Sequence, residues 1–178
     1  MGLPRAPALA CGAGEEDMTN DAPADEIRFL TADGRILASP SSVKDCPVIE
    51  YALPHSLGSS GEFTNLDWSN APFCRGWALV DTGADHNYID TALAEKLGVV
   101  PTQTVQVSGA TSTTAGKIID APLFLIGSRT ICDNEFITAD LRDNGRMYDV
   151  VIGRTILYQR TLLMCPTSDR YLISRAPL

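Results

Sequence analysis

Short segments of β-branched and aromatic residues follow one another along the second half of the chain, each closed by turn residues. Gly, Pro or Asn-Gly stands at most of their ends, which is typical of β-strands joined by tight connections. The segments with this pattern are residues 76–80, 104–107, 117–127, 134–140, 147–153, 160–165 and 170–174. The pattern therefore predicts a mostly β domain.

One segment carries helix signals instead. Asp90 can accept hydrogen bonds from the first amides of residues 91–97, and Gly98 can adopt the left-handed conformation that ends a helix. A second, shorter helical turn is expected after Gly153, through residues 155–159. We therefore expect one or two short helices in an otherwise β fold.

The amino-terminal part has a different composition. Residues 1–26 contain six Asp and Glu residues against Arg5 alone, and almost nothing large and apolar. Such a segment cannot bury enough surface to offset the entropy lost on ordering. We therefore predict a disordered acidic tail over residues 1–26.

The next part, residues 27–72, is predicted to be an irregular linker or a surface wrap. Residues 39–72 are dense in Pro, Ser, Gly and Asn, which favours irregular structure. Residues 27–37 alternate apolar and polar positions around Asp33-Gly34, so a small hairpin is expected there. The folded domain itself is expected to span residues 73–178.

Composition and charge exclude several classes of protein. The chain has 178 residues, 44% of them hydrophobic, which suffices for one domain with a core but not for two large ones. With a net charge of -8, the chain lacks the basic surface that nucleic-acid binding needs. No run of 18 apolar residues predicts a membrane span, and the amino end lacks the apolar stretch of a signal peptide, so a cytoplasmic location is expected.

The cysteines and histidines do not form a metal-binding pattern. Five cysteines are widely spaced, and His55 and His86 are the only histidines, so we expect reduced thiols, no metal and no cofactor. A calcium loop starting at Asp81 is also rejected, because Ala92 stands where a bidentate Glu is required.

The sharpest chemical feature is the segment W-A-L-V-D-T-G-A-D, residues 77–85. It is an apolar strand that delivers the carboxylate of Asp81 into a glycine-containing loop. A carboxylate there must be paired, hydrogen-bonded or functional, because burying it without partners costs several kcal/mol. The Thr82 hydroxyl and the Gly83 amide could brace it. The alternative is a carboxylate that merely caps a turn.

A second apolar segment, D-V-V-I-G-R over residues 149–154, also stops at a glycine. Together with D-T-G-A-D it resembles the retropepsins, the single-lobed aspartic proteases of retroviruses and their cellular relatives. The resemblance covers residues 73–174, and the stretch after D-T-G is more similar to cellular and bacterial relatives than to compact viral enzymes. It implies a single-lobe, β-barrel-like fold in which Ile152 and Gly153 pack under the D-T-G loop in a ψ-shaped structure.

The resemblance also implies a mechanism. Aspartic proteolysis needs two carboxylates that share one proton, and this chain has one D-T-G. We therefore expect a homodimer in which Asp81 of each subunit flanks one water molecule, with no metal and no covalent intermediate. The expected substrate is an extended peptide bound as an additional strand.

Further roles follow from the same resemblance. Gly83, Ala84 and Asp85 would contact the substrate, and Asp85 would pair with Arg154. Relatives with a hydroxyl at the position of Ala84 stabilise the ionised pair more strongly, so we expect a less acidic working pH here.

The resemblance also implies a flap, a hairpin that closes over the bound substrate and lies between the two motifs in the sequence. Its predicted residues are Gly109, Ala110, Thr111, Ser112 and Thr113; a plain mobile loop is the alternative. Two other functions remain open from the sequence. One is a catalytically silent retropepsin-like module that binds peptides or scaffolds a complex. The other is the protease domain of a retroelement polyprotein.

Overall fold

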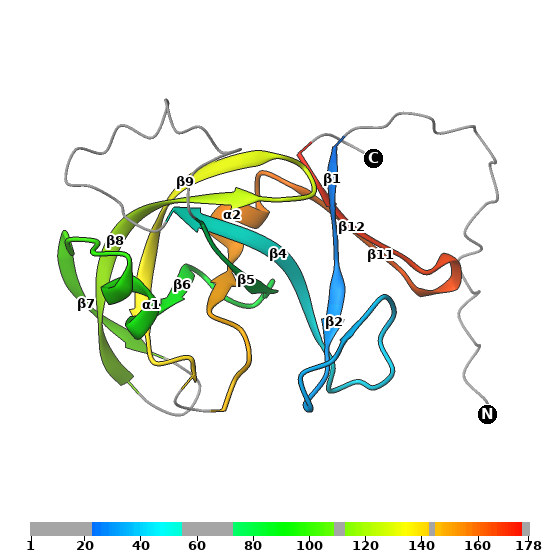
Figure 1. The fold of residues 1–178 in the computed structure, drawn as a ribbon, viewed down its shortest axis with the longest axis horizontal. Coiled ribbons are helices and arrows are strands. Elements are labelled where there is room, and N and C mark those ends of the chain that lie inside the picture. Colours follow the sequence, from blue (N-terminus) through cyan, green and yellow to red (C-terminus); the bar gives the residue numbers. More distant parts are fainter. Residues whose placement is uncertain (1–22, 55–72, 109–112, 143–144, 176–178) are drawn as a thin grey trace, which may run out of the picture.

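The structure is a computed structural model that describes residues 23–54, 73–108, 113–142 and 145–175 (Figure 1). These residues form two β-sheets, of which the larger makes up most of the fold. In these residues the sheet has the order β3-β2-β4-β5-β10-β6-β9-β8-β7. Its strands are β2 (Arg28–Leu30), β3 (Ile36–Leu37), β4 (Cys46–Pro54), β5 (Phe73–Val80), β6 (Asn87–Asp90), β7 (Gln103–Ser108), β8 (Thr113–Leu125), β9 (Thr130–Ala139) and β10 (Val150–Ile152).

An additional pairing closes this sheet into a barrel. β4 pairs with β5 along one edge and with β8 along the other, where Tyr51 lies opposite Leu125. The ring therefore runs β4-β5-β10-β6-β9-β8 and back to β4. β7 and the first half of β8 extend from it as a two-stranded arm, at the left of Figure 1. The expected mostly β, barrel-like fold is confirmed.

The interior of the barrel is apolar. Fully buried side chains come from every strand of the ring, and the hydrophobic free energy of about 25 cal/mol per Å² of buried apolar surface is what holds it closed. They include Ile49, Leu53, Ala78, Ile89, Leu123, Leu125, Phe136 and Ile152. Burial of both faces explains why β4 and β10 are nearly continuous apolar runs.

A smaller sheet of β1 (Ala24–Glu26), β12 (Arg170–Ser174) and β11 (Thr161–Cys165) lies beside the barrel. The hairpin of β11 and β12, closed by a 3₁₀ turn at Pro166–Ser168, projects at the right of Figure 1. β12 has neighbours on both edges within the same chain, β1 on one side and β11 on the other. The carboxyl-terminal strand therefore folds back onto its own subunit.

Both expected helices are present. α1 (Thr91–Lys96) begins at Asp90, whose Oδ1 accepts hydrogen bonds from the amides of Ala92 at 3.2 Å and Leu93 at 3.4 Å. It ends before Gly98, which has the left-handed φ of +68°. α2 (Arg154–Leu157) follows Gly153 directly. In the described part of the chain, no helix has the length and apolar character needed to span a bilayer.

The amino-terminal predictions are partly wrong. Residues 1–22 lie outside the described residues, but residues 24–26 form β1 rather than a disordered segment. Asp25 is only 3% exposed, and its Oδ1 accepts a hydrogen bond from the amide of Ser128 at 3.0 Å. The strand partner lies about 150 positions away in the sequence, so local composition does not reveal it.

The prediction for residues 27–72 is right in one place and wrong in another. The expected hairpin around Asp33-Gly34 is present as β2 and β3, with Gly34 at φ +84°. An irregular linker is wrong for residues 46–54, which form β4 beside β5 in the barrel. Pro47 and Pro54 suggest irregular structure, but they stand near the ends of this strand. Residues 55–72 lie outside the described residues.

The other strand predictions are confirmed to within a few residues, with one exception. Of residues 147–153, only Val150–Ile152 form a strand, β10, because Met147, Tyr148 and Asp149 lead into it as an irregular segment.

Candidate active site

The carboxylate of Asp81 lies where two parallel strands end. β5 and β10 run parallel, with Val80 opposite Ile152, and the amide of Asp81 donates a hydrogen bond to the Ile152 carbonyl at 3.0 Å. Val80 and Ile152 are buried, whereas Asp81 is only partly buried. The apolar strands therefore anchor the backbone and bring the carboxylate to the surface.

A tight loop braces this carboxylate. The Gly83 amide donates to Asp81 Oδ1 at 2.9 Å, and the Ala84 amide donates to the Asp81 carbonyl at 3.3 Å. The predicted amide brace is therefore present. Thr82 and Gly83 are exposed, and among the described residues the Thr82 hydroxyl makes no hydrogen bond to Asp81.

The ψ-shaped arrangement expected around Gly153 is also present. β10 lies between β5 and β6, and Gly153 packs directly under the loop that follows Asp81. A Cβ atom at Gly153 would lie 2.1 Å from the His86 carbonyl oxygen and 2.9 Å from that of Ala84. This close backbone approach, with an ordinary φ of -96°, is what requires glycine.

Arg154 ties the loop to α2. Its amide donates to the Ala84 carbonyl at 2.9 Å, and its guanidinium forms an ion pair with Asp85, as expected from the resemblance. The guanidinium carbon also lies 5.9 Å from the ring centre of Tyr158. Asp85 therefore has Arg154 as its ion-pair partner beside the loop.

Asn87 is a site residue that sequence reasoning missed. It is fully buried, its Oδ1 accepts from the Gly153 amide at 3.0 Å, and its Nδ2 donates to the Glu135 carbonyl at 3.3 Å. The side chain thus joins β6, β9 and the end of β10. Asn87 stands two positions before Ile89 and so shares its face of the strand. A polar residue on that apolar face was the available signal in the sequence.

A second buried polar cluster lies at the other end of the same strand pair. Asp149 is 9% exposed, pairs with Arg142, and accepts from the Tyr51 hydroxyl at 3.4 Å. Burial, and then the charge of Asp149, raises the pKa of Tyr51. Arg142 is an exposed residue whose side chain nevertheless reaches Asp149, and its amide donates a hydrogen bond to Asp90 at 3.0 Å.

A groove of about 640 Å³ opens next to the loop, and we name it the Tyr88 groove. Asp85 stands at its edge, and its walls include Tyr88, Val105, Val107, Ile118, Glu135 and Ile137. Burial, and then the nearby charge of Asp81, raises the pKa of Tyr88.

The predicted flap lies almost entirely outside the described residues. Residues 109–112 are not described, and Thr113 is the exposed first residue of β8, opposite Ser108 of β7. The arm formed by β7 and β8 borders the Tyr88 groove through Val105 and Val107.

No metal site is formed by the residues that the structure describes: no three His, Cys, Asp or Glu side chains gather closely enough to hold an ion.

The comparison with protein families gives a match over residues 69–156, to the family described as aspartyl protease. This part of the chain belongs to the retropepsin-like aspartyl proteases. The aspartyl protease segment contains β5 to β10, and with them Asp81, the ψ-shaped structure and the Tyr88 groove. No curated protein matches the chain.

Proposed function

We propose that the protein is an aspartic endopeptidase that acts as a homodimer on extended peptides. The observation that carries the proposal is the placement of Asp81. A carboxylate held by one amide, without a cation partner among the described residues, stands at the exposed tip of a rigid strand pair. Because the chain has one D-T-G, a second Asp81 must come from a second copy.

The chemistry follows from two such carboxylates that share one proton. The ionised Asp81 removes a proton from the bound water, whose oxygen attacks the peptide carbonyl carbon, while the protonated Asp81 hydrogen-bonds the carbonyl oxygen and transfers its proton to it. The tetrahedral intermediate then expels the amine, which takes up a proton, and the products are a carboxylic acid and an amine. Neither a metal nor a covalent enzyme intermediate takes part.

The surrounding loop supports this proposal. Thr82 and Gly83 are exposed beside Asp81, so a second copy can approach the carboxylate without displacing buried groups. Asp85, which pairs with Arg154, lines the Tyr88 groove, where it can meet a substrate main chain. Gly83 and Ala84 lie between Asp81 and Asp85 in the sequence, where the proposal has them contact the substrate.

Cleavage and assembly are tested together. The wild-type chain is sedimented and incubated with a peptide library, with and without a pepstatin-like inhibitor. We expect a dimer and inhibitor-sensitive cleavage, and no cleavage by the Asp81→Asn variant, which should remain folded and dimeric. Peptide binding without turnover at any pH would instead indicate a silent binding module.

A mixing experiment isolates the shared site. Wild-type chain is allowed to exchange subunits with a ninefold excess of Asp81→Asn, and activity is compared before and after exchange. If both carboxylates are needed, cleavage per wild-type chain should fall to about one tenth, because nearly every wild-type subunit then has a variant partner. Activity that stays constant after exchange contradicts the dimeric site.

A further inference from the structure

The floor of the Tyr88 groove is apolar along one face of the β7-β8-β9 sheet. Ile118 of β8 lies directly opposite Ile137 of β9, and Val105 and Val107 of β7 are half-buried on the groove wall. An aliphatic chain can pack on this part of the lining, whereas Gln106, Ser108 and Asn134 make other parts of the groove polar.

Charge lies immediately beyond this apolar floor. Asp120 and Glu135 lie opposite each other, two residues along from Ile118 and Ile137 respectively. Because side chains alternate along strands, both carboxylates lie on the same face as the two isoleucines. Both are exposed, and Glu135 itself lines the groove.

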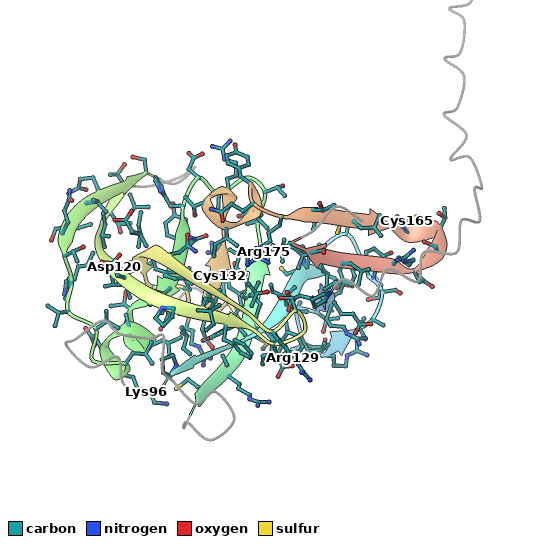
Figure 2. The ribbon with its side chains drawn as sticks, turned by 90° about the horizontal axis from the view of Figure 1, so that it is seen from above. Lys96, Asp120, Arg129, Cys132, Cys165 and Arg175 are labelled. Atoms are coloured by element: carbon teal, nitrogen blue, oxygen red, sulfur yellow. The ribbon has the colours of Figure 1, made fainter. Side chains whose placement is uncertain are left out.

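The two carboxylates lack a cation within the described part of the chain. The ion pairs found there use other acids, namely Glu26, Asp33, Asp85 and Asp149. Lys117 is adjacent to Ile118, opposite Thr104, and therefore lies on the other face. Figure 2 shows Asp120 toward the β7 and β8 side of the molecule, apart from Arg129 and Arg175.

Like charges opposite each other on paired strands destabilise a sheet. A cation placed between Asp120 and Glu135 would reverse this penalty, and of these two acids Glu135 lines the groove. Asp85 does not compete for such a cation, because Arg154 already pairs with it.

We propose that the Tyr88 groove selects peptides with Lys or Arg at the position that enters it. The aliphatic stem of the substrate side chain packs on Ile118 and Ile137, and its charged end meets Glu135 and Asp120. This inference rests on the proposed function and adds a substrate class to it.

The test uses one peptide that the wild-type enzyme cleaves. Each position flanking the scissile bond is replaced in turn by Lys, Arg, norleucine, Gln or Glu, and kcat/KM is measured. At one position, Lys and Arg should exceed norleucine by about five- to tenfold, the effect of two exposed charge pairs. Norleucine has the apolar stem without the charge, so the ratio isolates the charged end.

Variants then assign the preference to its residues. In Glu135→Gln the ratio of kcat/KM for the Lys peptide to that for the norleucine peptide should fall toward one. In Glu135→Lys the Lys peptide should be cleaved less well than the norleucine peptide, and the Glu peptide better. Asp120→Asn should lower the ratio by a smaller factor. Glu95→Gln is the matched control, because Glu95 is an exposed acid on α1 and does not line the groove.

The outcomes separate the two proposals. If no peptide is cleaved by the wild-type chain, the proposed function fails. If peptides are cleaved but the ratio is the same in wild type, Glu135→Gln and Glu135→Lys, the selectivity inference is overturned and the proposed function stands. Thermal unfolding of each variant shows whether a changed ratio reflects altered folding instead, because losing one of two opposed charges should leave stability equal or higher.

Discussion

Two carboxylates lie at opposite ends of the β5-β10 strand pair and have opposite surroundings. Asp149 precedes β10, lies almost completely buried beside Trp77, and has Arg142 and Tyr51 as partners. Asp81 follows β5, is partly exposed, and has the Gly83 amide as its one side-chain partner in the described residues.

The difference shows how a fold separates structural from reactive acids. A buried carboxylate is stable only when cations and hydrogen-bond donors satisfy it, and such a group has no free capacity for chemistry. A carboxylate with one brace at the surface retains lone pairs for a water molecule or a partner. The same strand pair therefore carries a fixed acid at one end and an available acid at the other.

The largest expected effect is on stability, at Gly153, whose backbone packs against the loop that follows Asp81. Gly153→Ala places a Cβ 2.1 Å from the His86 carbonyl, and backbone on both sides cannot move away cheaply. We expect a loss of more than about 3 kcal/mol of folding free energy, or no folded protein, measured by urea unfolding.

Gly83→Ala is the matched control. A Cβ there would lie 3.2 Å from Asp81 Oδ1, a contact that a small shift of the side chain relieves. It should keep the fold within about 1 kcal/mol of wild type and reduce peptide cleavage. Equal stability of the two variants would contradict the account of Gly153.

The next effect separates the two acids directly. Asp149→Asn removes the charge that pairs with Arg142 and should cost about 1–2 kcal/mol in urea unfolding. Asp81→Asn should change stability by no more than about 0.5 kcal/mol, because its side chain is partly exposed. If Asp81→Asn is the more destabilising of the two, Asp81 is a structural acid and the comparison fails.

The smallest effect concerns the reactive end alone. Relatives carry a hydroxyl at the position of Ala84, and by that resemblance Ala84→Ser would offer a hydrogen bond to the ionised form of the proposed Asp81 pair, which favours ionisation. The acidic limb of the kcat/KM profile should therefore move to lower pH, by up to about one pH unit, whereas its height changes little. A wild-type profile that already peaks at about pH 3 would contradict this expectation.

Much of the barrel could be predicted from local pattern. The strands from β5 onward follow from β-branched segments ended by turn residues, and α1 follows from Asp90 and Gly98. The two glycine-ended motifs indicated the position of Asp81 and the packing of Gly153, because each motif has its own chemical signature in a few consecutive residues.

Other features depend on partners that are distant in the sequence. β1 pairs with β12, and β4 forms a strand through its pairing with β5 and β8. Asn87 acts through Gly153 and Glu135, which lie 66 and 48 positions away. No local pattern encodes such pairings, so composition alone suggested a tail and a linker where strands occur.

The sequence by itself determined the chemistry: a single Asp-Thr-Gly loop at the end of an apolar strand, and the glycine that must pack beneath it. Local dihedral preferences and side-chain chemistry suffice to recognise each motif, because the residues within a motif are neighbours in the chain. The contact of Gly153 with the His86 and Ala84 carbonyls exists only in the folded chain. The tertiary structure decided which acids are buried and paired, which face of β8 and β9 lines the Tyr88 groove, and where β4 closes the barrel. Those properties arise from burial and register between distant strands, and only the folded chain brings them together.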